Sequence, residues 1–481
     1  MKRIMTMALL ALFLSGCHFY SNDYRNDVLE YAMITDSDDL SKLDEYPNLE
    51  YVDLRGSTCY DAILAYAAQH PDVTVRYNVG FGEKRFDATE TDIVLNGYET
   101  DYESLLQNLK YLPDLKTLHL NQAEFTGAQM EELISAYPGI DITYSVELCG
   151  RKYENSVEEL DLSHLTSDDV DDAIRTISML PQLRLVNLTG YGTDGRLSLE
   201  HVAQLTEGCP GVDFNYEFTL FGQRVSTLDE TLAFDSVQIG NEGVDQIRSA
   251  LAVMTKCHSV RLDSCGIDNE VMAQLRAEYP DKNISWRVFA GRFSMMTDEE
   301  MIRMNHSLRD EQASVLKYCT KVKYMDLTSS KITNIDFANH MPDLECVVLT
   351  LTKVEDLSPL ANCANLTWLE ISSCSRIKDL SALSGLRNLK YLNISNTSIK
   401  DVTSLEQLPL ERFNCVRSGV KNQILEEFVS KHPDCLTTAK GYALEYGWRY
   451  NDKQLKEPFS YYAHMQEVFR YNDKTFKGNT K

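Results

Sequence analysis

The chain has 481 residues, of which 43% are hydrophobic, and it carries a formal net charge of −25. This hydrophobic content is enough to build a folded core, so the acidity does not indicate disorder. A strongly acidic protein is repelled by nucleic acid and by anionic envelope polymers, and we exclude both as expected partners.

The first residues are typical of an export signal. A basic start at Lys2 and Arg3 is followed by an apolar stretch, residues 8–14, that is too short to span a bilayer permanently. The next residues, Leu14-Ser15-Gly16-Cys17, resemble the lipobox of bacterial lipoproteins. The resemblance implies that residues 1–16 are removed and that Cys17 is lipidated, for example with palmitate. An ordinary signal peptide with an incidental cysteine is the alternative.

We therefore expect residues 17–27 to form a short polar tether. The mature protein is then expected at the cell membrane, lipid-anchored on its extracytoplasmic side. No other segment is long and apolar enough to predict a membrane-spanning helix.

A repeat of about 70 residues runs through residues 28–310. Its marker is a proline that follows a helical pattern, and successive markers (Pro71, Pro138, Pro210 and Pro280) are 67, 72 and 70 residues apart. Proline ends a helix because it has no backbone N–H to donate. After each proline comes an alternating stretch with an aromatic centre and then a glycine, which predicts a strand that turns into a hairpin.

Residues 311–435 contain a shorter repeat in which apolar residues follow the pattern apolar-x-x-apolar-x-apolar. The five copies end at Leu327, Leu349, Ile371, Ile394 and Cys415, with spacings of 22, 22, 23 and 21 residues. So short a period cannot enclose a core of its own and must stack into a solenoid. A later proline, Pro433, lies 153 residues after Pro280, so the short repeats interrupt the longer series and favour one continuous α/β solenoid.

The short repeats resemble the leucine-rich repeats of the internalin type. The resemblance rests on residues 352–360, 366–371 and 376–383 and covers about a fifth of the chain. Where that family has an inward asparagine ladder, this chain has Ser330, Thr352, Cys374, Thr397 and Ser418. The resemblance implies a leucine-rich-repeat solenoid with a concave parallel sheet.

Side chains alternate along a strand, so the residues between the apolar ones point out from the concave sheet. They form columns, and tyrosine, tryptophan and arginine are the residue types that most often dominate binding surfaces. We predict that this face binds a partner through Tyr324, Asp326, Trp368, Glu370, Tyr391, Asn393 and Arg412. The alternative is that large residues there only shield the strands.

Residues 436–481 are rich in aromatic residues and contain a duplication. Residues 448–453 (WRYNDK) recur as residues 469–474 (FRYNDK), 21 positions later. We expect this segment to cap the last turn of the solenoid, because solenoid ends must be sealed. A glycan-binding element is the alternative, since aromatic rings stack on sugars.

The remaining motifs have structural interpretations. Of the twelve cysteines, Cys17 is set aside, and most others are expected to be free core thiols, with Cys257 and Cys265 the one pair to test as a disulfide. The acidic run at residues 168–172 opens a helix, where carboxylates favour the positive end of the helix dipole. We find no catalytic motif, metal-ligand spacing or cofactor loop, so no enzyme, metal or cofactor is expected.

The sequence thus predicts a surface-anchored recognition or adhesion protein that binds a protein partner through its concave face. The alternative is a glycan-binding or structural lipoprotein of the cell envelope that uses the aromatic C-terminal residues.

Overall fold

The computed structural model describes residues 18–21, 28–34, 37–96, 99–121, 125–190, 196–441, 448–451 and 457–480. Cys17 and residues 1–16 lie outside this set, as does most of the predicted tether. The chain forms two compact units, residues 1–218 with 226–228, and residues 219–225 with 229–481. The boundary therefore falls in the hairpin of β14 (Glu217–Leu220) and β15 (Gln223–Ser226), and not at the predicted change of repeat length near residue 310.

The first unit consists of short parallel sheets, each flanked by helices and followed by a hairpin. Its strands are β1 (His18–Ser21), β2 (Val28–Met33), β3 (Tyr51–Asp53), β4 (Thr74–Arg76), β5 (Asn78–Phe81), β6 (Lys84–Asp87), β7 (Asp92–Asn96), β8 (Thr117–Asn121), β9 (Asp141–Leu148), β10 (Arg151–Glu154), β11 (Glu159–Asp161), β12 (Leu185–Asn187) and β13 (Asp213–Asn215). Its helices are α1 (Tyr60–Gln69), α2 (Tyr102–Asn108), α3 (Gly127–Ala136), α4 (Val170–Ile177) and α5 (Leu199–Gly208).

The predicted signals of the long repeat mark the ends of these elements. Helices α1, α3 and α5 each end two residues before a marker proline. Glycines 82, 150, 222 and 291 all have positive φ, between 58° and 81°, at the tips of the hairpins. The acidic run opens α4, where Thr166 and Asp169 form a reciprocal capping box. The helix-start interpretation is therefore confirmed.

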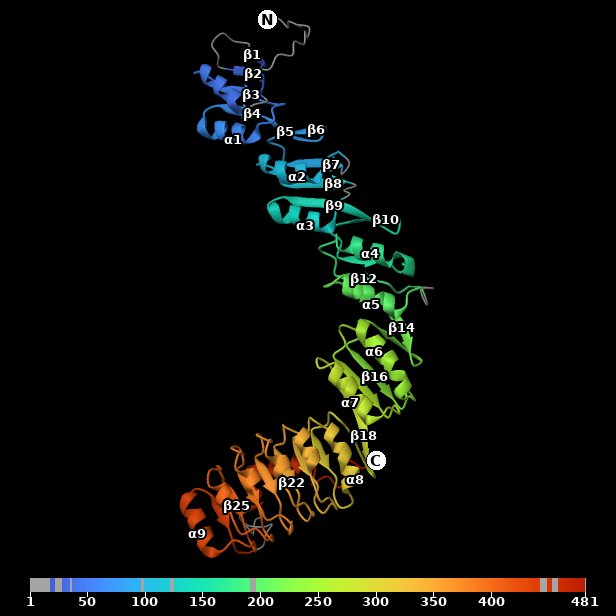
Figure 1. The fold of residues 1–481 in the computed structure, drawn as a ribbon, viewed down its shortest axis with the longest axis vertical. Coiled ribbons are helices and arrows are strands. Elements are labelled where there is room, and N and C mark those ends of the chain that lie inside the picture. Colours follow the sequence, from blue (N-terminus) through green and yellow to red (C-terminus); the bar gives the residue numbers. More distant parts are fainter. Residues whose placement is uncertain are drawn as a thin grey trace. The chain divides into compact units, whose positions relative to one another are not determined.

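The second unit begins with one more long repeat and continues into the short ones (Figure 1). The long repeat contains β16 (Thr231–Asp235), α6 (Val244–Val253), β17 (Ser259–Asp263), α7 (Asn269–Glu278), β18 (Asn283–Ala290) and β19 (Phe293–Met296). A parallel sheet of seven strands follows: β20 (Met301–Arg303), β21 (Tyr324–Asp326), β22 (Cys346–Val348), β23 (Trp368–Glu370), β24 (Tyr391–Asn393), β25 (Arg412–Asn414) and β26 (Leu436–Thr438). The remaining helices are α8 (Asp310–Ala313), α9 (Asn422–Lys431) and α10 (Ser460–Val468).

Each short repeat pairs with the next in unbroken register, so equivalent residues form columns. One such column consists of Tyr324, Cys346, Trp368, Tyr391 and Arg412, each beside the next. The turn after each strand has one residue in the left-handed region, for example Leu351 with φ of 64°. Its N–H donates to Ser372 of the next repeat at 2.9 Å. The ladder of hydrogen bonds thus continues past the strand and offsets the backbone strain.

Aspartates that cap the connecting turns after β22, β23 and β24 explain why these returns are short 3-10 helices. Asp356 accepts a hydrogen bond from the backbone N–H of Ser358, and Asp379 accepts one from Ser381, both at 2.8 Å. Such local bonds favour a turn over a longer helix. This arrangement lets 22 residues or so complete one turn of the solenoid.

The apolar residues of the repeat fill the interior, as predicted. Leu327, Leu349 and Ile371 are fully buried. The ladder position is occupied by Cys374, whose Sγ donates to the carbonyl of Leu349 at 3.0 Å. All eleven described cysteines are free thiols, and Cys257 and Cys265 are not bonded to each other. In the described part of the chain, no helix is both long and apolar enough to cross a bilayer.

We predict that Leu369→Ala lowers the free energy of unfolding of the second unit by about 2–5 kcal/mol, because it leaves a cavity in the solenoid interior. Leu369 has 0% exposure in β23. Urea unfolding followed by circular dichroism measures the change. Lys378→Ala, at an exposed position of the same repeat, is the matched control and should change stability by less than about 0.5 kcal/mol. Equal effects of the two substitutions would contradict the assigned register.

The concave face and the C-terminal segment

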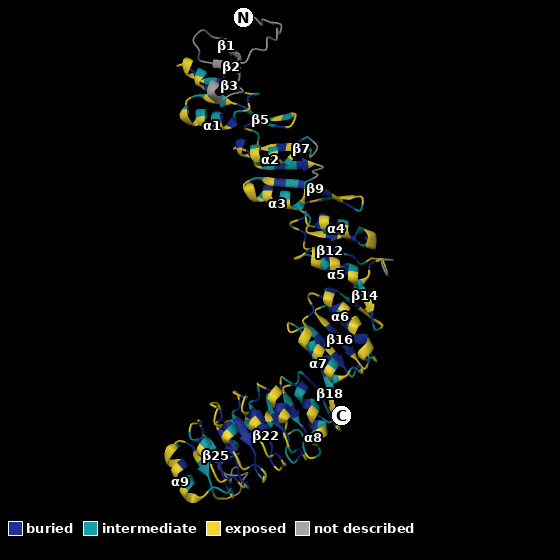
Figure 2. Ribbon diagram, in the orientation of Figure 1, coloured by how far each residue is buried: buried dark blue, intermediate teal, exposed yellow. Residues whose placement is uncertain are grey.

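The predicted binding residues lie on one face of the seven-stranded sheet, which we call the concave face, defined by the outward side chains of β20 to β25. The structure brings all seven of them together there, but it leaves little of this face exposed. Trp368, Glu370 and Asn393 have 0% exposure, Asp326 has 2% and Tyr391 has 9%. Strands β22, β23 and β24 are buried on both faces, and Figure 2 shows β22 in the colour of buried residues.

Residues 448–451 and 457–480, called here the C-terminal segment, cover the concave face. They run back along the sheet from β25 to β19, where Thr480 forms a bridge with Phe293. Figure 1 accordingly places the C-terminus beside β18. The predicted cap over the last turn is therefore wrong for these residues. The aromatic side chains of the segment are buried against the concave face instead.

An aromatic layer joins the two surfaces. The Trp448 ring lies 4.4 Å from that of Trp368, measured between ring centroids. Tyr461 stacks on Trp368 at a centroid distance of 5.6 Å and lies tilted against Tyr391 at 5.0 Å. Trp448 has 0% exposure. Aromatic pairs of this kind contribute about 0.5–1.5 kcal/mol each beyond the area they bury.

The two ends of the concave face make further contacts with the segment. The Arg412 guanidinium lies 3.9 Å from the centroid of the Phe459 ring, and its Nη2 donates to Asn451 at 2.6 Å. At the other end, Tyr324 packs edge-on against Phe469, at a centroid distance of 6.3 Å. Every aromatic or arginine residue that we predicted as a binding residue thus contacts the C-terminal segment.

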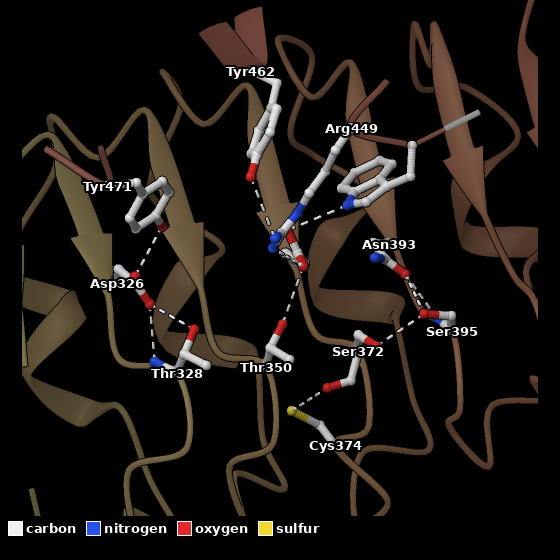
Figure 3. A network of polar contacts seen from close by, with 12 residues as sticks. Asp326, Thr328, Thr350, Ser372, Cys374, Asn393, Ser395, Arg449, Tyr462 and Tyr471 are labelled. Atoms are coloured by element: carbon white, nitrogen blue, oxygen red, sulfur yellow. Dashed lines mark hydrogen bonds and ion pairs between the residues drawn. The ribbon is translucent and has the colours of Figure 1, made fainter. Parts of the chain in front are cut away.

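An ion pair lies at the centre of this interface. Arg449 Nη2 donates to Oε1 of Glu370 at 2.7 Å, and Trp448 Nε1 donates to Oε2 at 3.2 Å. Thr350 donates to the same carboxylate at 3.3 Å. Figure 3 shows the Arg449 guanidinium pointing into this network beside Tyr462. Burial disfavours the charged guanidinium, but the attraction of Glu370 outweighs it and raises the pKa of Arg449 above its usual value.

A second polar contact lies two strands away. Tyr471 donates its hydroxyl proton to Oδ2 of Asp326 at 2.8 Å, and Thr328 donates its backbone N–H to Oδ1 at 3.0 Å (Figure 3). Burial, together with the negative charge of Asp326, raises the pKa of Tyr471 well above its usual value. The phenol therefore stays protonated as a donor.

The duplicated motif accounts for both contacts. Its two copies place Trp448 against Trp368 and Phe469 against Tyr324, and both Trp448 and Phe469 have 0% exposure. The first copy reaches Glu370 through Arg449, and the second reaches Asp326 through Tyr471. The two copies therefore contact the same sheet at two places, the first over β23 and the second over β21.

The last residues of the segment form an anchor that sequence reasoning missed. Arg303 donates its backbone N–H to Asn479 Oδ1 at 2.6 Å, and its side chain donates to the carbonyl of Phe469 at 2.8 Å. Gly478 has φ of 76°, and a Cβ there would lie 2.2 Å from the carbonyl oxygen of Arg303. Only glycine fits this approach. Extending the repeat register by one strand would have found Arg303, because it pairs with Asp326.

Several polar groups at the interface have no hydrogen-bond partner among the described residues. They include Trp368 Nε1, Asn393 Nδ2, Arg412 Nη1 and Arg449 Nε, all buried and all donors. Leaving a buried donor unpaired costs about 1–3 kcal/mol. The interface therefore has a well-paired acidic centre and a set of unsatisfied donors beside it. No group of residues able to hold a metal ion is found in the described part of the chain.

The unbroken register and the repeated apolar interior define the fold as a leucine-rich-repeat solenoid. Two family models match, "Leucine Rich repeats (2 copies)" over residues 364–407 and "Leucine Rich Repeat" over residues 115–138. These matches cover two stretches of the chain and agree with the leucine-rich-repeat fold. No curated protein sequence matches the chain significantly.

Three solved structures illustrate the likeness. An internalin of Listeria monocytogenes is 16% identical, with 86% of this chain and 81% of that chain covered and a TM-score of 0.25. Internalin C2 of the same organism is 19% identical, with 45% and 74% covered and a TM-score of 0.24. A leucine-rich-repeat protein of Leptospira interrogans is 15% identical, with 82% and 91% covered and a TM-score of 0.29.

We predict that Arg449→Ala releases the C-terminal segment. While the segment stays docked, an unpaired buried Glu370 costs about 3–5 kcal/mol. Undocking removes this cost because it returns the carboxylate to water. Trp368 and Trp448, two of the three tryptophans, are fully buried, so their fluorescence emission should shift to longer wavelength. Lys474→Ala, at an exposed position of the segment, is the control. Unchanged emission in Arg449→Ala would show that the ion pair does not hold the segment.

Proposed function

We propose that this protein recognises a protein partner through the concave face of its short repeats. The observation that carries the proposal is that this face already binds a polypeptide, the C-terminal segment. The contacts between them include aromatic rings, arginine side chains and carboxylates. Parallel columns of such side chains suit a chain that crosses several repeats. The fold itself is a scaffold on which binding residues are displayed.

The glycan-binding alternative has less support. It requires the aromatic rings of the C-terminal segment to stack on sugars. Trp448 and Phe469 have 0% exposure, and Phe459 and Tyr462 have 6% and 5%. These rings would have to leave the concave face before a sugar could reach them.

The binding face is tested by a photo-reactive amino acid placed at Tyr324, which lies at the partly exposed edge of the aromatic layer. On intact cells, illumination should give a cross-link to a second protein. The same amino acid at Lys378, an exposed position in the turn after β23, is the control. Cross-links from Tyr324 that reach only the chain's own C-terminal segment, or equal yields from both positions, would contradict recognition through this face.

We further propose that the protein acts at the cell membrane, anchored through Cys17 by a lipid. The support is the resemblance of residues 14–17 to a lipobox, since lipidation at the first mature residue attaches a protein without a spanning helix. Cys17→Ser should abolish incorporation of radiolabelled palmitate and release the protein from the membrane fraction. Labelling that persists in Cys17→Ser would exclude this residue as the site of attachment.

A further inference from the structure

The concave face imposes a charge requirement on whatever covers it. Glu370 is fully buried beneath the segment, and its oxygens accept hydrogen bonds from Arg449, Trp448 and Thr350. An occupant without a cation at this position would bury the carboxylate unpaired. The penalty for an unpaired buried charge makes the face selective for a segment that carries arginine next to an aromatic residue.

The electrostatics of the surrounding face point the same way. Tyr324 and Tyr391 donate their hydroxyl protons to Glu345 and Glu411, at 2.9 and 2.8 Å. Four carboxylates, counting Asp326 and Glu370, thus lie on or beside the face, and one of them, Glu411, is also paired with Lys390 at 2.9 Å. Such an arrangement attracts a cationic segment and repels an acidic one.

Two buried donors of the face are left over by the contacts that the described residues make. Trp368 Nε1 and Asn393 Nδ2 lie on adjacent strands, β23 and β24, and both are buried donors without a partner among the described residues. The orientation of the Asn393 amide is fixed, because its Oδ1 accepts from the backbone N–H of Ser395 at 3.0 Å. A segment that presents carbonyl or carboxylate oxygens to these donors would gain hydrogen bonds that the described residues do not supply.

We propose that the C-terminal segment is an exchangeable occupant of the concave face, and that the partner is a polypeptide segment of another protein with an arginine beside an aromatic residue. This inference rests on the proposed function and names the partner class for the same face. The partner places its aromatic residue on Trp368 and its arginine on Glu370. The partner competes with the C-terminal segment for the concave face. Because the C-terminal segment is covalently attached, its local concentration is high, and a partner must bind tightly enough to displace it.

The test uses the full chain and a fluorescein-labelled peptide that comprises residues 448–480. In the Trp448→Ala, Phe469→Ala double variant the resident segment has lost both aromatic anchors. This variant should bind the peptide at least tenfold more tightly than the wild-type chain does, measured by fluorescence anisotropy. Circular dichroism verifies that the solenoid remains folded. If the double variant does not fold, Arg449→Met in the full chain provides the same comparison.

The charge requirement is tested on the same background. Adding Glu370→Gln to the double variant should weaken peptide binding at least tenfold. Arg449→Ala within the peptide should weaken binding by the same factor. A peptide with Lys474→Ala, the control, should bind as tightly as the unchanged peptide. Absence of peptide binding by the double variant, or binding unaffected by Glu370→Gln, would overturn the proposal. So would concentration-dependent dimerisation of the wild-type chain by exchange of C-terminal segments, because a second copy would then be the occupant.

The two proposals fail in different ways. A partner that cross-links to position 324, combined with no peptide binding by the double variant, leaves recognition by this face standing and rejects the arginine–aromatic chemistry. Peptide binding that follows the charge requirement, without any cross-linked partner on cells, supports the chemistry of the face and rejects recognition of a separate protein there.

Discussion

The buried ion pair between Glu370 and Arg449 determines how the concave face of the short repeats is arranged. A carboxylate in a strand with no solvent exposure is stable only if its charge is compensated. The compensation comes from a residue 79 positions later in the chain. The aromatic layer around the pair excludes water and strengthens it, and the pair in turn fixes the register at which Trp448 meets Trp368. The concave face and the C-terminal segment are therefore specific for each other, because a shifted alignment would separate Trp448 from Trp368 and Arg449 from Glu370.

The solenoid was predictable because its signals are local. The apolar pattern repeats every 22 residues or so, and prolines, glycines and aspartates mark the ends of elements within a few positions of where the structure has them. Pro138 follows the end of α3, Gly150 turns the β9–β10 hairpin, and Asp356 caps a 3-10 turn. The division into two units was not predictable in this way, because the repeat continues across the boundary without a change in composition.

The site was predictable only in part. Alternation along a strand was enough to place Tyr324, Trp368, Tyr391 and Arg412 on one face, and the structure confirms that placement; their binding to a partner stays a prediction. The occupant could not be found from periodicity, because docking of the C-terminal segment depends on contacts between residues far apart in sequence. The duplicated WRYNDK and FRYNDK stretches were the one available sign. The two copies contact the sheet two strands apart and through different motif positions, Arg449 in the first and Tyr471 in the second, so the duplication alone did not reveal the contacts.

Gly478 and Asn479, which fasten the segment to β20, come later in the chain than every strand of the sheet. They leave the ribosome after every strand of the sheet has been made. Until then, Trp368, Tyr391 and Glu370 have no segment to cover them, so the growing chain carries an uncovered aromatic surface. Maturation of this face is therefore coupled to synthesis of residues 448–480, and a chain that stops before them is recognisable by the surface it leaves uncovered.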